Sequence, residues 1–261
     1  MGIIPVAAAP HPLILAHRGG AGEATENTWT AFRNVARLGV THLETDAQVT
    51  ADSQVVLSHD ETLERMFGRP GRISDYTYAE LSQFRTASGE QLPLLREVLE
   101  ELPQLFLNID AKTDEVVAPL LAVLAQVGAF GRVLIASFSE RRLRRVRALA
   151  DIPELTTSLG VSGAVRLFGA ARTVFDPARW GVPGVESHVR AVQVPQRLGM
   201  LRVVDRRLVA TAHRLGLAVH VWTVNEAKDM VMLLDLGVDG IITDYPSLLK
   251  EILIERGQWP L

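Results

Sequence analysis

The sequence predicts an α/β protein that folds as a single (β/α)8 TIM barrel with a small insertion after its second strand region. Three observations support this prediction. The chain has 261 residues, close to the roughly 250 residues typical of such barrels. Strand-like apolar runs alternate with segments of helical spacing along nearly the whole chain, a pattern typical of parallel strands joined by crossover helices. Polar side chains also gather where the predicted strands end.

The predicted strands are short apolar runs. The first covers residues 13–17 and the second covers residues 42–50, with residues 55–59 taken as an extension of the second unit. Further strands are predicted at residues 105–112, 132–138, 155–159, 191–195, 218–224 and 240–243. This gives eight strands, which at this chain length favours a closed barrel over an open doubly wound sheet.

Helical spacing of apolar residues follows most of these strands. In residues 26–38 the apolar positions include Trp29, Phe32 and Val35, and Gly39 ends the segment as a helix C-cap. Further helices are predicted at residues 115–127, 140–150, 205–215, 226–236 and 246–256. Residues 60–103 break this rhythm with Gly68, polar residues and prolines, so we expect the insertion there. The whole chain, residues 1–261, is expected to form one domain.

Composition excludes several function classes. The formal net charge of −3 gives no basic excess for nucleic acid or a membrane surface. The absence of cysteine excludes a disulfide framework, cysteine-ligated zinc and thiol catalysis. Residues 116–131 form the longest run without a charged residue or histidine, short of the roughly 20 residues of a spanning helix, so no stable membrane insertion is expected. Residues 1–12 lack the features of a targeting signal, and the expected location is cytoplasmic.

Candidate functional residues lie at or near the ends of the predicted strands. Barrel enzymes build their active sites at the C-terminal ends of the strands, so these side chains should converge on one mouth. A sequence that only filled a barrel core would carry valine, isoleucine and leucine there. The candidates are His17, Arg18, Glu44, Asp46, His59, Asp110, Lys112, Trp222 and Asp244.

Three of these residues are acids that could bind a metal ion. Glu44 and Asp46 are two apart on one strand, so their side chains point to the same face, and Asp110 lies on the next strand. Buried carboxylates are costly unless they are paired or bound to a cation. Three hard oxygen donors suit Mg²⁺ or Ca²⁺ better than zinc. The alternative is a surface pair of acids at a strand end.

The remaining candidates suit phosphodiester chemistry. His17 and His59 could act as general acid and general base, because imidazole titrates near neutral pH. Arg18 and Lys112 are cations for anionic phosphate oxygens. The alternative is a set of structural ion pairs in which Lys112 balances Asp110.

Seven short motifs, in order, resemble those of the glycerophosphodiester phosphodiesterase family. The resemblance spans roughly residues 13–253. The motifs are His17-Arg18-Gly19, Glu26-Asn27-Thr28, Glu44-Thr45-Asp46, Ser58-His59-Asp60, Asp110-Ala111-Lys112, Trp222-Thr223-Val224-Asn225, and residues 237–246 with Asp244.

The resemblance implies a role for each matched residue. It assigns Glu44, Asp46 and Asp110 to one divalent cation, Mg²⁺ or Ca²⁺, and His17 and His59 to acid–base catalysis. It assigns the phosphate to Arg18 and Lys112, and an aromatic wall of the substrate pocket to Trp222, although an indole in the barrel core is an equally physical interpretation. It places Glu26 among the substrate-binding residues, where it would order Arg18 or metal-bound water. Asp110 departs from the family, which usually has glutamate there.

The implied function is metal-dependent hydrolysis of a small-molecule glycerophosphodiester to glycerol 3-phosphate and an alcohol. One alternative is a lysophospholipase-D-like or sphingomyelinase-D-like enzyme that acts on a lipid headgroup. That alternative would need an exposed apolar rim, for which the insertion offers Met66, Phe67, Tyr76, Tyr78 and Phe84, although ordinary packing of these residues is the simpler interpretation. A second alternative is a non-catalytic phosphate-binding protein.

Overall fold

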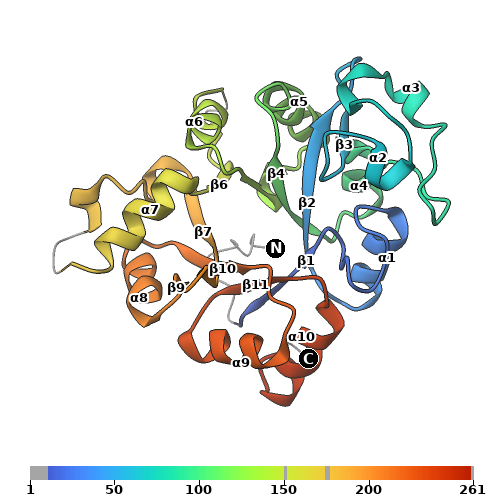
Figure 1. Ribbon diagram of the computed structural model, residues 1–261. Helices are drawn as coiled ribbons and strands as arrows, with labels where there is room; N and C mark the ends of the chain where they lie inside the picture. Colours follow the sequence, from blue (N-terminus) through green and yellow to red (C-terminus); the bar gives the residue numbers. More distant parts are fainter. Residues whose placement is uncertain (1–10, 150–151, 174–176, 260–261) are drawn as a thin grey trace.

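The computed structural model describes residues 11–149, 152–173 and 177–259, and it contains a closed barrel of parallel strands (Figure 1). The barrel closes because β1 pairs with both β11 and β2. The predicted (β/α)8 fold is therefore confirmed. Around the barrel, the strands are β1 (Leu13–His17), β2 (His42–Val49), β4 (Phe106–Ala111), β5 (Val133–Ala136), β6 (Thr156–Ser158), β7 (Val189–Pro195), β10 (Ala218–Trp222) and β11 (Gly240–Thr243).

Helices surround these strands (Figure 1). The first begins after Thr28, whose hydroxyl accepts a hydrogen bond from the backbone N–H of Ala31, and it buries Phe32 and Val35 as the sequence spacing predicts. Two parts of the sequence predictions lie outside the described residues. They are residue 150, at the end of a predicted helix, and residues 1–10, in the segment considered for a targeting signal. The surrounding helices are α1 (Trp29–Arg37), α4 (Leu95–Glu101), α5 (Val117–Val127), α6 (Glu140–Leu149), α7 (Val161–Ala170), α8 (Arg206–Arg214), α9 (Ala227–Leu236) and α10 (Pro246–Glu255).

The segment between β2 and β4 holds the elements of the predicted insertion. β3 (Val55–Leu57) runs antiparallel to β2 and is not a member of the parallel barrel. The short helices α2 (Glu64–Phe67) and α3 (Tyr78–Leu81) enclose a separate small apolar cluster. The predicted range of residues 60–103 also includes α4, an unpredicted helix whose apolar side chains join the barrel core.

Two further elements were not predicted from the sequence. Helix α7 follows β6, and a two-stranded hairpin of β8 (Arg197–Leu198) and β9 (Leu201–Arg202) follows β7. Both lie at the C-terminal ends of their strands, which is where a barrel enzyme builds its site. The described residues also form short 3-10 helices: η1 (Ile73–Asp75), η2 (Phe130–Arg132), η3 (Pro177–Trp180) and η4 (Val185–Ser187).

Across the described ranges, none of the helices has the length and apolarity needed to cross a membrane. The cytoplasmic location stays a prediction.

At the opposite end of the barrel, His42 begins β2 and is buried. Its ring stacks on Phe106 with centroids 5.0 Å apart, and its Nδ1 lies 2.9 Å from Thr41 Oγ1. Burial, together with repulsion from His220 and His11, lowers the pKa of His42 to about 3. The folded protein therefore holds this imidazole neutral well below neutral pH.

Acid should destabilise the fold through His42. Between the unfolded pKa near 6.5 and the folded pKa near 3, the unfolded chain binds a proton that the folded chain does not, so the free energy of unfolding falls as the pH drops through this range. From pH 7 to pH 5 we expect this residue to account for a loss of about 2 kcal/mol. Urea unfolding at both pH values should show that His42→Gln loses correspondingly less stability than the wild type. An equal loss in both proteins would contradict the assignment.

Candidate active site

A cavity of about 600 Å³ lies at the C-terminal ends of the barrel strands. Strand register brings its charged residues together, because His17 on β1 pairs with Glu44 on β2, and Asp46 on β2 pairs with Asp110 on β4. Eight of the predicted site residues line this cavity: His17, Arg18, Glu44, Asp46, His59, Asp110, Lys112 and Trp222.

His17 ends β1 and is held by an aspartate from the other end of the chain. Its Nδ1 lies 2.6 Å from Asp244 Oδ1, and its Nε2 lies 3.9 Å from Glu44 Oε2. Asn225 donates a hydrogen bond of 2.6 Å to the second oxygen of Asp244. Burial alone would raise the pKa of Asp244, but the hydrogen bonds from His17 and Asn225 lower it overall. Asp244 is therefore a carboxylate that fixes the orientation of the His17 ring.

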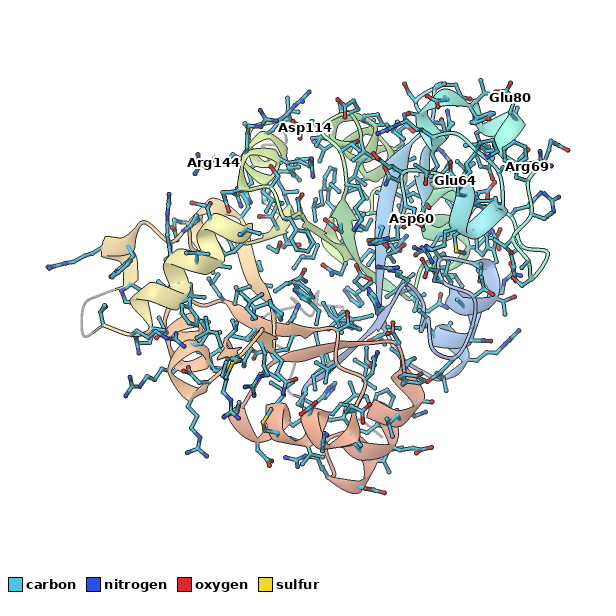
Figure 2. The ribbon with its side chains drawn as sticks, viewed as in Figure 1. Asp60, Glu64, Arg69, Glu80, Asp114 and Arg144 are labelled. Carbon is cyan, nitrogen blue, oxygen red and sulfur yellow. The ribbon has the colours of Figure 1, made fainter. Side chains whose placement is uncertain are left out.

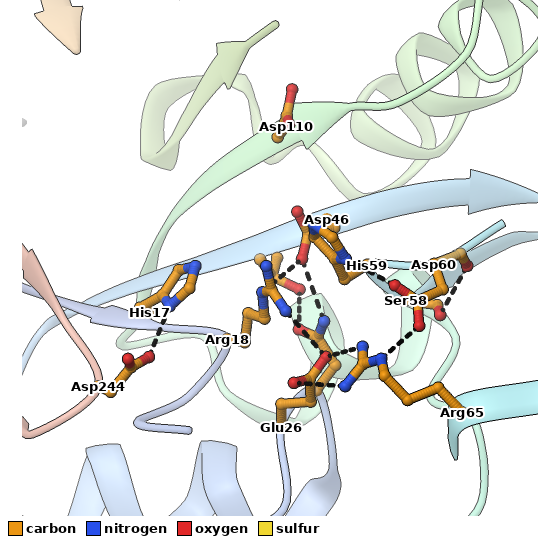
Figure 3. A network of polar contacts seen from close by, with 12 residues as sticks. His17, Arg18, Glu26, Asp46, Ser58, His59, Asp60, Arg65, Asp110 and Asp244 are labelled. Carbon is orange, nitrogen blue, oxygen red and sulfur yellow. Dashed lines mark hydrogen bonds and ion pairs between the residues drawn. The ribbon is translucent and has the colours of Figure 1, made fainter. Parts of the chain in front are cut away.

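His59 follows β3 and is held in a similar way. Its Nδ1 lies 2.7 Å from Asp60 Oδ1, while the guanidinium of Arg65 donates to the other oxygen of Asp60. Although burial acts to raise it, the pKa of Asp60 is lowered by Arg65 and His59. Figure 3 shows that the two histidine–aspartate pairs lie apart from each other. Figure 2 shows Asp60 nearer the barrel centre than Arg69 and Glu80, which lie farther out on the insertion.

Arg65 was missed by the sequence analysis, and it connects His59 with Arg18. Its guanidinium lies 2.6 Å and 3.0 Å from the two oxygens of Glu26, and Glu26 accepts a 3.1 Å hydrogen bond from Arg18 Nη1. These two arginines lower the pKa of Glu26 against the opposing effect of burial. Glu26 lies beside the 600 Å³ cavity rather than along its lining, so it orders Arg18, and a direct contact between Glu26 and substrate stays a prediction.

Arg18 has an unusual backbone conformation. Its backbone φ of 51° lies in the left-handed region, which few residues other than glycine adopt. In this conformation the backbone N–H of Arg18 donates to Glu44 Oε2 at 3.2 Å, and its Nε lies 3.4 Å from Asp46 Oδ2. One residue thus contacts two of the predicted metal ligands and Glu26. The strain is consistent with a functional position.

The three predicted metal ligands are buried around Lys112. The Lys112 Nζ lies 2.7 Å from both Asp46 Oδ1 and Asp110 Oδ2. Burial raises the pKa of Glu44, and repulsion from Asp46 and Asp110 raises it further. Burial likewise raises the pKa of Asp110, although Lys112 partly offsets the effect. Burial acts to lower the pKa of Lys112, but its two acidic partners raise it overall. Three acids thus share this pocket with Lys112, which contacts two of them directly.

Within the described parts of the chain, no three His, Asp or Glu side chains are already grouped to hold a metal ion. Lys112 occupies the space between Asp46 and Asp110. The metal assignment from the sequence stays a prediction, which is taken up below.

Trp222 ends β10 and lines the same cavity, where it packs edge-on against Phe138 with ring centroids 5.6 Å apart. The indole lines the cavity and also packs against the buried cluster of Leu13, Leu15 and Ile242, so its contact with substrate stays a prediction. The aromatic residues of the insertion lie elsewhere: Phe67, Tyr76, Tyr78 and Phe84 pack on the small apolar cluster beside β3. Ordinary packing is therefore the correct interpretation of those four residues.

Comparison with known proteins identifies relatives of this chain. Residues 17–248 match the sequence profile of the glycerophosphoryl diester phosphodiesterase family. A Mycobacterium tuberculosis protein named "probable glycerophosphodiester phosphodiesterase 2" is 36% identical, and the match covers 95% of this chain and 92% of that protein. A human lysophospholipase D is 30% identical, with 92% of this chain and 85% of the human protein covered.

Comparison with solved structures also identifies proteins that are similar to this chain. A structure from Silicibacter pomeroyi, described as a candidate glycerophosphoryl diester phosphodiesterase, superposes with a TM-score of 0.80 at 27% identity and 99% coverage of both chains. An Oleispira antarctica phosphodiesterase in complex with its product sn-glycerol 3-phosphate has the same fold, with a TM-score of 0.76, 24% identity, and coverage of 94% of this chain and 97% of that one. The resemblance inferred from the sequence motifs is confirmed, and the chain belongs to the glycerophosphoryl diester phosphodiesterase family of phosphoric diester hydrolases.

Proposed function

We propose that the protein hydrolyses glycerophosphodiesters to glycerol 3-phosphate and an alcohol by two-histidine acid–base catalysis. One observation carries the proposal: two histidines, each held at Nδ1 by an aspartate, line a single cavity together with Arg18 and Lys112. A carboxylate at Nδ1 orients the ring and leaves Nε2 to exchange a proton with a reactant.

Each side chain then has a defined task. Arg18 and Lys112 bind the anionic phosphate oxygens and stabilise the charge that develops on them. One histidine accepts the proton of the attacking hydroxyl, and the other donates a proton to the departing alcohol oxygen as its bond to phosphorus breaks. The attacking hydroxyl belongs either to water or to the neighbouring glycerol carbon. In the second case a cyclic phosphate forms first, and water then opens it.

One divalent cation, Mg²⁺ or Ca²⁺, belongs to this proposal. The donor set fits such an ion, because burial raises the pKa values of Glu44 and Asp110, and repulsion from neighbouring carboxylates adds to the effect. Glu44, Asp46 and Asp110 would hold it, and Lys112 would have to yield the space between the two aspartates. When bound, the cation would supply positive charge for the phosphate oxygens.

Release of glycerol 3-phosphate tests the proposal. Purified protein should release it from glycerophosphocholine and glycerophosphoethanolamine when Mg²⁺ or Ca²⁺ is added, and a chelator should stop the release. Glycerol 3-phosphate is measured directly, so a phosphatase acting on a monoester is not counted. Tight phosphate binding without release of glycerol 3-phosphate, under any of these metal conditions, would instead favour a non-catalytic phosphate-binding protein.

A further inference from the structure

Arg65 links the insertion to the charged groups of the barrel mouth (Figure 3). It lies on α2, a single helical turn without a buried residue, and its side chain is 47% exposed. Its guanidinium nevertheless makes three contacts with two acids. Its Nε lies 2.5 Å from Asp60 Oδ2, and its Nη1 and Nη2 lie 3.0 Å and 2.6 Å from the two oxygens of Glu26. One half-exposed side chain thus joins two acids that are distant in the sequence.

Each of these acids also holds a group of the site. Asp60 Oδ1 lies 2.7 Å from His59 Nδ1, and because Asp60 is a carboxylate, the proton between them resides on the imidazole. Glu26 Oε1 accepts a hydrogen bond of 3.1 Å from Arg18 Nη1. The contacts therefore form one continuous chain: His59, Asp60, Arg65, Glu26 and Arg18.

The two ends of this chain are groups on which the proposed reaction depends. Among the described residues, His59 and Arg18 line the cavity, whereas Arg65 and its two acids do not. Any contact between Arg65 and the reacting groups therefore passes through Asp60 or Glu26.

The planar fork of a guanidinium suits this double role. Its five N–H donors lie in one plane, so it can contact both oxygens of one carboxylate and still reach a second carboxylate. The side chains of Glu26 and Asp60 are only 14% and 21% exposed, so water and salt screen these pairs less than fully exposed ones. Hydrogen bonds to Glu26 and Asp60 raise the pKa of Arg65 against the effect of burial. Held by Arg65, each carboxylate stays in the orientation that keeps its other partner in place.

We propose that Arg65 is a positioning residue that orients the His59 ring through Asp60 and the Arg18 guanidinium through Glu26. This inference rests on the proposed function, which assigns proton transfer to His59 and phosphate binding to Arg18. The insertion then has a part in catalysis, because its helix α2 sets the geometry of two groups that line the cavity. In the alternative, Arg65 only fastens the insertion to the barrel.

Steady-state release of glycerol 3-phosphate tests this role in Arg65→Gln and Arg65→Lys. A displacement of catalytic groups by about 1 Å costs about 10²-fold in rate, so we expect kcat to fall by about this factor in Arg65→Gln. Lysine retains the charge, but its ammonium is a point charge that cannot reproduce the fork. Arg65→Lys should therefore recover only a small part of the loss. Nearly full activity in Arg65→Lys would show that charge alone suffices and would overturn the proposal.

Arg72→Gln is the matched control. Arg72 belongs to the same insertion, its side chain is 55% exposed, and it forms an ion pair of 2.6 Å with Glu61 outside the cavity lining. We expect Arg72→Gln to keep the wild-type kcat, and urea unfolding to show that both variants are folded under the assay conditions. An equal loss of kcat in the two variants would favour simple fastening of the insertion and would overturn the proposal.

A combined variant shows whether Arg65 acts through its two acids. Asp60→Asn with Glu26→Gln weakens both arms of the chain, so a further Arg65→Gln change should lower kcat far less than the same change does in the wild type. A further loss of about 10²-fold would show that Arg65 acts independently of the two acids, which would overturn the positioning role.

A spectroscopic measurement distinguishes failure of this inference from failure of the proposed function. An imidazole Nδ1 proton held by a carboxylate exchanges slowly with water and gives a downfield proton NMR signal, which the His59→Ala variant assigns to His59. We expect Arg65→Gln to broaden or remove this signal and Arg72→Gln to keep it. The signal of His17, which is held by Asp244, should remain in both variants.

An unchanged kcat in Arg65→Gln would overturn the positioning role and leave the proposed function standing. A wild type that hydrolyses no diester would overturn the proposed function. Loss of the His59 signal in Arg65→Gln alone would then still support the positioning of that ring, and an unchanged signal would overturn it as well.

Discussion

Alanine in place of His17 or His59 should each lower the turnover of a glycerophosphodiester about 10²–10⁴-fold, because each variant removes one proton-transfer step in the transition state. Both rings are already oriented, with Nδ1 within 2.7 Å of a carboxylate oxygen. Substrate binding should change little, since Arg18 and Lys112 hold the phosphate in this proposal. The effect should therefore appear in kcat rather than in KM, as measured by steady-state release of glycerol 3-phosphate.

A second substrate distinguishes the acid from the base. With a nitrophenyl ester the leaving group needs no proton, so the variant that lacks the general acid should recover most of its activity, and the other should not. His213→Ala is the matched control, because His213 also pairs with an aspartate, at 2.7 Å from Asp239 Oδ2, but outside the cavity. Near-normal turnover of a natural diester by both cavity variants would show that the two-histidine mechanism is wrong.

The change Glu44→Gln should abolish metal-dependent activity while it preserves the fold. Glutamine keeps the shape of the buried side chain but removes one of three mutually repelling charges. The metal-free variant should therefore unfold at a temperature no lower than the wild type. At a metal concentration 100 times its dissociation constant, the wild type should gain about 2.7 kcal/mol in free energy of unfolding. The variant should gain little at the same concentration.

Asp110→Glu is the corresponding control for charge. It retains the carboxylate and restores the residue usual in the family, so both activity and the metal-induced shift in melting temperature should survive. An unchanged metal affinity in Glu44→Gln would remove Glu44 from the proposed ligands. A dead Asp110→Glu enzyme that still binds metal would show that the shorter side chain sets the position of the ion.

The barrel could be predicted because its strands are apolar runs at regular spacing, but α7 could not. Its sequence contains Gly163 and Gly169, and glycine disfavours a helix when considered locally. In the structure both glycines allow close packing: a Cβ at Gly163 would lie 2.9 Å from Leu159 Cδ2, and one at Gly169 would lie 2.9 Å from the Trp180 ring. Tertiary packing outweighs propensity there, and a sequence taken alone does not show that packing.

The charged half of the site was predictable for a different reason. Parallel strands place their C-terminal ends together, so strand-end residues such as Glu44 and Asp110 had to meet. Arg65 could not be found in this way, because it comes from α2 within the insertion, where the sequence has no strand periodicity. Its contact with Glu26 depends on how that insertion folds back over the barrel.

The pairing of β1 with β11 has a consequence for the newly made chain. His17 and Asp244 are 227 residues apart, so the carboxylate that orients the first histidine is translated long after that histidine. At roughly 5–20 residues per second, His17 waits roughly 10–45 s on the ribosome for its partner. The barrel itself also stays open until that strand arrives. A nascent chain therefore has neither a closed barrel nor an oriented His17 until Asp244 has been translated.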